Sequence, residues 1–260
     1  MILYKYTPER SGCEIVTGNS IGFAGPASFN DPFEISTGTT VGPGEEIPQP
    51  GFALTSLARR GRLMDTSAIL SLSRSPLNPL MWAHYGEGYR GFAFGFEGSN
   101  ELFSSTESNV VPAQFGNVIY SETVPGPHRM GKEGPLKLGR EYSFRPEILE
   151  QLQRMFLYKK SCWSYEEEVR VVKCITGLGI EGGTIESGRF QVKPLENGHL
   201  YLTEIPPGAL REVFLGERNR LRRGAGFDKF VNTLRKNHPE VKIYRASVDT
   251  SSWRMRREEL

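Results

Sequence analysis

Short apolar runs separated by turn-rich segments make up most of the chain. Residues 68–73 (AILSLS) alternate apolar with small polar side chains, as a half-buried strand does. The run 91–96 (GFAFGF) alternates large side chains with small ones, and other runs are rich in residues that favour strands. The pattern therefore predicts strands at 2–6, 20–24, 68–73, 91–96, 167–175, 189–193, 212–215 and 241–246.

The clearest helical pattern lies at residues 146–160 (PEILEQLQRMFLYKK). A proline lies near its start, acidic residues occupy its first turns, and its apolar residues recur every three or four positions. Shorter helices are predicted at 80–89 and 222–236, and loops at 38–50 and 124–139. Strands outnumber helices and do not alternate with them regularly. We therefore predict an α+β fold of central, mostly antiparallel sheets with a few packed helices, in a single domain, 1–260.

The composition is that of a folded protein, with no sign of export. Hydrophobic residues make up 38% of the chain and charged residues 24%, and no stretch of eighteen apolar residues occurs. The opening MILYKYTPER places charged and aromatic residues where a signal peptide needs an apolar region. Cys13, Cys162 and Cys174 form no CxxC pair, so neither a disulfide framework nor a thiolate zinc site is indicated. We expect a cytoplasmic protein that does not associate with membranes.

Positive charge is concentrated toward the C-terminal end. The net charge is only +2, but residues 209–260 hold thirteen Lys or Arg against seven Asp or Glu, a local net charge of +6. A solvated basic face is the simplest interpretation, and phosphate binding is the alternative. The arginines form two groups, Arg218, Arg220, Arg222 and Arg223 before a predicted helix, and Arg254, Arg256 and Arg257 after the last predicted strand.

The segment at residues 29–34 (FNDPFE) combines an Asn-Asp-Pro turn with two phenylalanines. Asn30 or Asp31 can bind the backbone and set the turn, while Phe29 and Phe33 anchor it in the core. The functional alternative is a loop beside a site, with Asn30 or Asp31 facing a ligand.

The segment MWAHY places His84 beside Tyr85 on a predicted helix. A single histidine near a tryptophan is more often a core or supporting group than a catalytic one. His128, His199 and His238 are scattered along the sequence, so no histidine pair is spaced for a metal ion. The sequence predicts no metal site and leaves His84 and Tyr85 as candidate binding residues.

Three consecutive glutamates in WSYEEEVR (163–170) stand at the start of an apolar strand. On a strand, Glu166 and Glu168 would face one side and Glu167 the other. Two carboxylates on one face repel each other unless a cation, a ligand or a hydrogen-bond donor lies between them. Arg170 shares that face, so a structural ion pair is the simple interpretation. The alternative is a carboxylate pair that binds a sugar hydroxyl or stabilises an incipient cation.

Taken in order, these motifs resemble an uncharacterised bacterial family, a domain of unknown function numbered twenty-nine seventy-one. The resemblance runs through LYKY, FNDPFE, a Ser-x-Ser strand, LMWAHY with GFAFGF, and KKSCWSYEEEVR. It covers roughly the first two-thirds of the chain, and as an ordered set the motifs are specific. The family name itself implies no activity.

The order of the motifs is also similar to that of ADP-ribosyltransferases. Those enzymes carry a basic residue on the first strand, a Ser-x-Ser strand in the middle and an ExE motif that opens a later strand. Lys5, the pair Ser71 and Ser73, and the pair Glu166 and Glu168 match these elements. Lys5 is a departure, because lysine cannot make the bidentate contacts of arginine. The resemblance implies an ADP-ribosyltransferase-like fold and NAD as the substrate.

The resemblance also implies roles for several of the candidate residues. Cleavage of the nicotinamide–ribose bond passes through an oxocarbenium-like state, which a carboxylate bound to the ribose 2′-hydroxyl stabilises. Glu168 would take that role, and Glu166 would position or deprotonate the acceptor. The other roles are ribose binding by Ser73, pyrophosphate binding by Lys5, and stacking on nicotinamide by Tyr85 or Phe23.

The sequence therefore predicts an NAD-dependent ADP-ribosyltransferase or NAD glycohydrolase that acts on an unknown macromolecular acceptor, as a bacterial toxin or defence effector. One alternative is a nucleic-acid-binding or protein-interaction module that uses the basic C-terminal region. Another is a metal-dependent nuclease built from Asp31, Glu34, Glu166 and Glu168. No feature indicates the oligomeric state.

Overall fold

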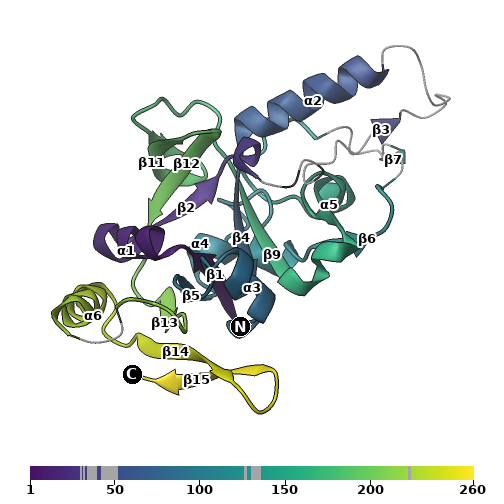
Figure 1. Cartoon of the computed structure of the whole chain (residues 1–260). Helices are drawn as coiled ribbons and strands as arrows, with labels where there is room; N and C mark the ends of the chain where they lie inside the picture. The colour runs from purple at the N-terminus through teal and green to yellow at the C-terminus, as the bar shows by residue number, and fades with distance from the viewer. Residues whose placement is uncertain are drawn as a thin grey trace.

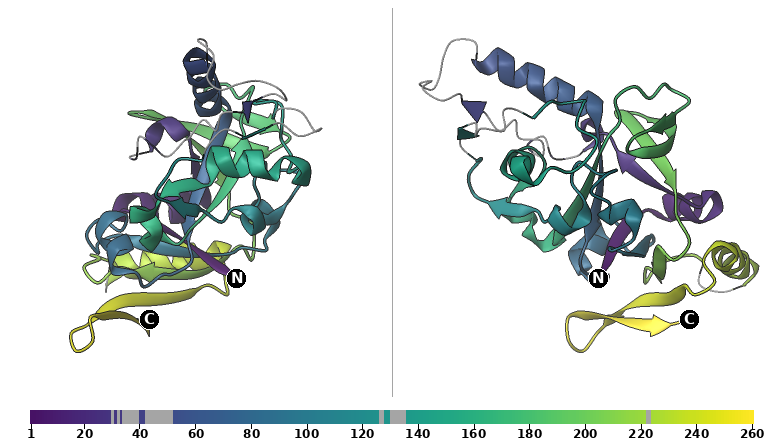
Figure 2. Two further views of the ribbon diagram at one scale, coloured as in Figure 1. Left: turned by 90° about the vertical axis from the view of Figure 1, so that its right-hand side faces the viewer. Right: turned by 180° about the vertical axis from the view of Figure 1, so that it is seen from behind.

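A large, mostly antiparallel sheet with helices on both faces forms the body of the protein (Figures 1 and 2). The structure is a computed structural model, and it describes residues 1–29, 31, 33, 40–41, 52–125, 128–129, 136–221 and 224–260. The predicted α+β class is confirmed. In the part of the chain that is described, no helix has the length and apolar character needed to cross a membrane.

The helical elements are α1 (Glu9–Gly18), α2 (Phe52–Thr66), α3 (Pro79–His84), α4 (Glu101–Ser104), α5 (Leu149–Phe156) and α6 (Ala225–Asn237), with 3₁₀ turns η1 (Pro26–Ser28), η2 (Ala113–Phe115), η3 (Pro146–Ile148) and η4 (Ser161–Glu166). The first strands are β1 (Ile2–Thr7), β2 (Ser20–Ala24), β3 (Thr40–Val41), β4 (Ser67–Ser73), β5 (Phe92–Glu97), β6 (Ile119–Ser121), β7 (His128–Arg129) and β8 (Tyr158–Lys160). The remaining strands are β9 (Glu168–Cys174), β10 (Gly183–Ile185), β11 (Gly188–Leu195), β12 (Gly198–Glu204), β13 (Leu210–Leu215), β14 (Lys242–Asp249) and β15 (Arg254–Glu259).

Strand β4 lies at a fork in the sheet. One edge of β4 pairs antiparallel with β9 along its whole length. The other edge pairs with β1 through Tyr4 and Ser73, and with β2 through Ala24 and Ile69. Strands β1 and β2 therefore leave opposite ends of β4, and Ser71 lies between the two pairings.

Each side of the fork continues into further strands. One branch runs from β1 through β5, β13 and β14 to β15, and the other runs from β2 through β12 and β11 to β10. Figure 1 shows the first branch at the bottom and the second at the upper left, with β4 and β9 between them. The far edge of β9 is covered by residues 110–118, whose backbone forms hydrogen bonds with it.

The two faces of the sheet carry separate apolar cores. Helices α1, α4 and α6 pack on one face, where Val16, Phe103 and Phe230 join the side chains of Leu70 and Leu72 from β4. Because successive residues of a strand point to opposite sides, the serines of β4 belong to the other face. That second face carries the candidate site.

Two apolar clusters flank the second face. Met81 and Trp82 of α3 pack with Tyr6 of β1 and Phe214 of β13. Helix α5 packs Leu152 and neighbouring residues against β4 and β9 in the other cluster. The polar side chains described below lie between these clusters, which places them away from bulk water.

Most predicted strands are confirmed within about two residues, and the helices predicted at 80–89 and 222–236 are confirmed as α3 and α6. Helix α1 and strand β15 were not predicted. Helix α1 contains two glycines, and β15 (RMRREE) has no apolar alternation. Packing against α6 and pairing with β14, respectively, determine these elements.

Three sequence interpretations need correction. Strand β4 is covered on both faces rather than half-buried, because six of its seven residues are buried and Ser71 is partly buried. The predicted loops 38–50 and 124–139 contain β3 and β7, which pair with each other. Apart from Thr40–Val41, the segment 38–50 lies outside the described residues.

The predicted helix at 146–160 ends early, at Phe156. The backbone carbonyl of Phe156 accepts a hydrogen bond from Arg170, and that of Leu157 accepts one from Ile119. Residues 158–160 then pair with β6 as β8. These tertiary partners satisfy the last helical carbonyls, so the chain can leave the helix and direct Lys159 into the interior.

Candidate functional site

The three motifs around Lys5, Ser71 and Glu168 lie on adjacent strands. Tyr4 of β1 pairs with Ser73 of β4, and Ser73 pairs with Glu168 of β9, so the three residues form one row across the sheet. Lys5 follows Tyr4, and Ser71 pairs with Arg170. Segments far apart in the sequence thus meet beside the fork.

The side chain of Lys5 forms a hydrogen bond at the fork. Its Nζ donates a hydrogen bond of 3.3 Å to the backbone oxygen of Ser71. Because Ser71 lies between the pairings of β4 with β1 and with β2, its carbonyl faces the gap where the two strands diverge. The ammonium group of Lys5 therefore occupies the position that a strand backbone would otherwise fill.

Glu166 and Glu168 converge, but by a different route from the one predicted. Glu166 ends the 3₁₀ turn η4 rather than lying on the strand, and Glu167 adopts a left-handed conformation with φ of 46°. This turn places the Glu166 carboxylate next to that of Glu168, the first residue of β9. Both glutamates are buried, with 4% and 3% exposure, whereas Glu167 is exposed.

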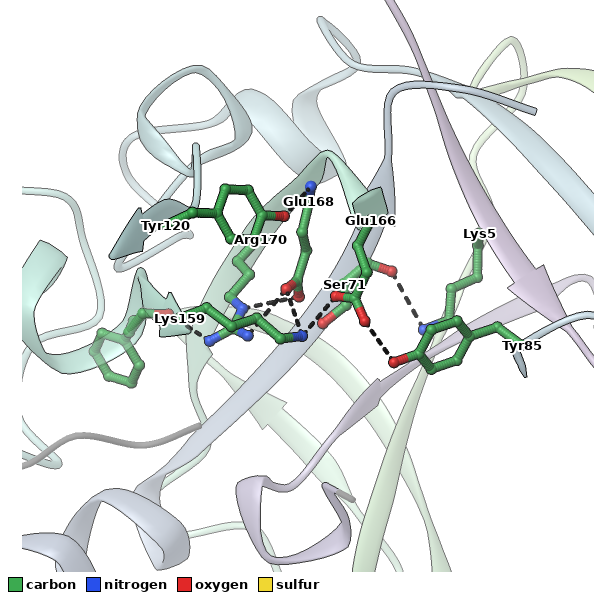
Figure 3. A network of polar contacts seen from close by, with 9 residues as sticks. Lys5, Ser71, Tyr85, Tyr120, Lys159, Glu166, Glu168 and Arg170 are labelled. Atoms are coloured by element: carbon green, nitrogen blue, oxygen red, sulfur yellow. Dashed lines mark hydrogen bonds and ion pairs between the residues drawn. The ribbon is translucent and has the colours of Figure 1, made fainter. Parts of the chain in front are cut away.

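A buried lysine joins the two carboxylates (Figure 3). Lys159 Nζ lies 2.5 Å from Glu166 Oε2 and 3.2 Å from Glu168 Oε2. It supplies the cation that two facing carboxylates need. The helical pattern of residues 146–160 predicted Lys159 at the end of a helix, whereas the doubled lysine shortly before three glutamates is the signal that points to this site.

Arg170 holds Glu168 from the other side. Its Nε and Nη2 donate to the two carboxylate oxygens of Glu168 at 2.8 and 3.0 Å, and its Nη1 donates to the Phe156 carbonyl at 2.6 Å. Arg170 has 0% exposure, and its guanidinium lies 5.8 Å from the ring centroid of Phe29. The predicted structural ion pair is therefore present, with bidentate geometry.

Helix α3 brings Tyr85 to Glu166. The Asn78 side chain caps α3 by accepting from Leu80 and Met81, and its amide donates to the Tyr165 carbonyl at 2.5 Å. This contact fixes α3 against η4. The Tyr85 hydroxyl then donates a 2.6 Å hydrogen bond to Glu166 Oε1.

Two hydroxyl groups complete the surroundings of Glu168. Hydrogen bonding by the Ser71 hydroxyl helps to lower the pKa of Glu168. The Tyr120 hydroxyl accepts the backbone N–H of Glu168 at 2.9 Å, and burial raises the pKa of Tyr120 to about 12. Ser73 bonds the backbone of Ser75 instead of a glutamate.

The two carboxyl groups have pKa values shifted in opposite directions. Burial raises the pKa of Glu166, despite opposing effects of Lys159 and Tyr85. Burial alone would also raise the pKa of Glu168, but Arg170, Lys159 and Ser71 together lower it to about 2. A neighbouring pair with separated pKa values can divide the roles of proton carrier and permanent anion.

Two candidate residues lie away from the glutamates. Phe23 is fully buried in the core on the opposite face, where its ring packs edge-on against Phe190. The prediction that Phe23 stacks on nicotinamide is therefore wrong, because strand alternation turns its side chain to the other side. His84 is exposed on α3, with its ring centroid 6.0 Å from that of Tyr165.

The FNDPFE segment has a structural role where it is described. Asp31 accepts the backbone N–H of Phe33 at 2.9 Å, as expected for a turn-setting residue. Phe29 packs beside the second core, but Phe33 is 76% exposed and does not anchor the segment. Asn30 lies outside the described residues.

The proposed nuclease site is not supported by these contacts. Glu34 lies outside the described residues, and Glu166 and Glu168 already have Lys159 and Arg170 as cationic partners. A divalent cation would have to compete with both. Among the residues that the structure describes, no group of three or more His, Cys, Asp and Glu side chains could hold a metal ion.

The central segment of the chain matches a known protein family. Residues 81–171 match a family described as a protein of unknown function (DUF2971), which confirms the family predicted from the motifs. No curated protein and no solved structure matches the chain. The matched segment contains most of the buried polar cluster, namely Tyr85, Tyr120, Lys159, Glu166, Glu168 and Arg170.

A second buried lysine lies on the opposite face of β9. Lys173 is 1% exposed and donates to the backbone oxygens of Ser108 and Ser187, both at 3.0 Å. It lines a cavity of about 440 Å³ together with Glu101 and Glu204. Burial lowers the pKa of Lys173 to about 7.

We expect this lysine to make stability depend on pH. Between pH 7 and 10.5 the unfolded chain binds a proton that the folded chain lacks, so the free energy of unfolding rises with pH. The slope from one proton is at most about 1.4 kcal/mol per pH unit. Urea unfolding from pH 7 to 10 should show this rise in the wild type and in a Lys229→Met control, but not in Lys173→Met. Parallel profiles for all three proteins would contradict the expectation.

Proposed function

We propose that the protein is an NAD-consuming enzyme, an ADP-ribosyltransferase or NAD glycohydrolase, with Glu168 and Glu166 as its catalytic residues. The observation that carries the proposal is the meeting of Lys5, Ser71 and Glu168 on adjacent strands at the fork. These residues belong to three segments whose order along the chain suggested the same activity. An ADP-ribosyltransferase-like fold is part of this proposal.

The pKa shifts of the two glutamates support different catalytic roles for Glu168 and Glu166. Glu168 is ionised at neutral pH, because its pKa is lowered to about 2. A fixed anion of this kind stabilises positive charge that develops on the ribose as nicotinamide leaves. Glu166, whose pKa is raised, is the better group to take a proton from an attacking water or acceptor.

The remaining residues have supporting roles in the proposal. The Ser71 hydroxyl helps to keep Glu168 ionised, and Ser73 is the candidate ribose ligand. Lys5 is the candidate for the pyrophosphate. Because both glutamates are covered, NAD can reach them only if η4 moves away from β9 and Tyr85 releases Glu166.

The cellular setting is also part of the proposal. Cys13, Cys162 and Cys174 are all free thiols, as expected for a protein that acts in the cytoplasm. The acceptor would be another macromolecule. A role as a bacterial toxin or defence effector rests on the resemblance to ADP-ribosyltransferases alone.

Nicotinamide release from NAD tests the proposal. We expect release by the wild-type protein and a loss of at least about a hundredfold in Glu168→Gln, because the amide cannot supply the negative charge. Glu167→Gln is the matched control, since it removes the same charge from the neighbouring exposed residue. We expect it to retain wild-type activity.

Binding of NAD, measured by calorimetry, separates the remaining outcomes. Neither release nor binding by the wild type would overturn the proposal. Full activity in Glu168→Gln would remove Glu168 from the catalytic role. Binding without release would indicate that a macromolecular acceptor has to be added to the assay.

A further inference from the structure

The C-terminal strands form a hairpin that extends beyond the rest of the sheet. Strand β14 pairs with β13 only from Lys242 to Arg245, whereas it pairs with β15 as far as Asp249 and Arg254. The outer half of the hairpin is therefore a two-stranded ribbon. Figures 1 and 2 show this ribbon projecting from the body in each view.

A tryptophan stands fully in solvent at the tip of the hairpin. Trp253 is 99% exposed and has a left-handed backbone with φ of 54°. Tryptophan gains much from burial, and a bulky residue rarely adopts this conformation. A residue held at such a cost in the open is a candidate for contact with a partner.

The turn that carries Trp253 is fixed by Asp249. The Asp249 carboxylate accepts hydrogen bonds from the hydroxyl groups of Ser251 and Ser252 at 2.6 and 2.8 Å, and Arg256 lies 3.4 Å from it. These bonds lower the pKa of Asp249 to about 2, so the carboxylate that accepts them is ionised at neutral pH. The indole is therefore presented on a preorganised support, which reduces the entropy lost on binding.

Exposed arginines lie at the tip of the hairpin and beside the inner part of β14. Arg254 follows Trp253 directly and is exposed. The carboxylate of Glu217 binds Arg245 at 2.7 Å, which brings the exposed Arg218 and Arg220 alongside β14. Within the residues described, Arg218, Arg220 and Arg254 form no ion pair with an acidic side chain. Their charge is thus available to an anionic partner.

We propose that this hairpin binds single-stranded nucleic acid, with a base stacked on Trp253 and phosphates bound by Arg218, Arg220 and Arg254. An indole ring can stack on a base only if that base is not already stacked between its neighbours. Single strands offer such bases, and duplexes do not. The local excess of positive charge in residues 209–260 favours a phosphate backbone over a protein partner. This binding is independent of the proposed NAD chemistry.

Fluorescence anisotropy with labelled twelve-nucleotide RNA and DNA strands, and with the matching duplexes, tests the proposal. We expect the full-length protein to prefer single strands, and the RNA and DNA arms to show which sugar it favours. Trp253→Ala should weaken binding by about 5- to 150-fold, whereas Trp253→Phe should retain most of the affinity. Arg254→Gln should weaken binding and reduce the dependence of log K on log salt by about 0.7.

Two controls keep the result interpretable. Ile180→Ala removes another exposed apolar side chain, and Arg140→Gln removes another exposed arginine, and neither should change affinity. Trp253 has almost no buried surface, so its variants should unfold at the wild-type temperature. Absence of single-strand binding by the wild type, or unchanged affinity in Trp253→Ala, would overturn the proposal and point to a protein partner for this surface.

Discussion

Replacement of Arg170 by alanine is expected to lower the free energy of unfolding by about 3–5 kcal/mol. Arg170 makes two hydrogen bonds to the Glu168 carboxylate and one to the Phe156 carbonyl, all out of contact with water. Without the guanidinium, the buried Glu168 carboxylate loses one of its cationic partners and the Phe156 carbonyl loses this hydrogen-bond donor. The missing side chain also leaves a cavity. The expected measurement is a urea unfolding curve with a lower midpoint and an unchanged slope.

The control for Arg170 is a surface arginine with an ion pair of its own. Arg10 lies 3.2 Å from Glu14 on α1, but its side chain is 91% exposed. Arg10→Ala should therefore cost no more than about 0.5 kcal/mol. A double replacement, Arg170→Met with Glu168→Leu, should recover part of the loss, because it removes both buried charges together. A loss below about 1 kcal/mol in Arg170→Ala would show that the ion pair does not support the fold.

Replacement of Lys159 by methionine is expected to destabilise the protein by a similar amount at pH 8, about 3–5 kcal/mol, and by less at pH 5. Lys159 separates two buried carboxylates, and its removal leaves Glu166 facing Glu168 without a cation. Glu168 keeps Arg170, so Glu166 is the group that takes up a proton. Its pKa, already raised by burial, should rise further.

The sign of the pH dependence follows from that shift. A carboxyl group whose pKa is higher in the folded state keeps a proton that the unfolded chain has released, so stability falls as pH rises from 4.5 through the folded-state value. Lys160→Met is the control, because Lys160 is adjacent but exposed. Urea unfolding of both variants between pH 5 and 8 should show the extra pH dependence only in Lys159→Met. A constant difference from the wild type across this range would contradict the bridging role.

The sequence by itself determined the fold class and the positions of most strands. Apolar runs such as 68–73 and 212–215 are short, rich in strand-forming residues and bounded by turn signals, and these local properties persist in the folded protein. The ordered motifs also predicted the family that residues 81–171 match. Strand positions can be predicted from the sequence because the properties that produce them lie within each segment.

Tertiary structure decided which of those residues meet and in what state. The position of Glu166 depends on the left-handed turn at Glu167, which a rule of strand alternation does not anticipate. Lys159 reaches the glutamates only because the preceding helix ends at Phe156, where a tertiary donor replaces the helical hydrogen bond. The early end of a helix depends on partners distant in sequence, so its own residues do not show it.

Tertiary structure also explains why Phe23 is buried and Trp253 is exposed. Both are aromatic residues near turns, and hydrophobicity alone would bury both. Phe23 is in the core because the pleat of β2 turns it toward Phe190, whereas Trp253 is exposed because β14 and β15 extend past β13. The sequence determined which side chains the protein has for chemistry and binding. The sheet register and the fork at β4 decided which of them are buried together and which are exposed to solvent, because both depend on pairing between distant segments.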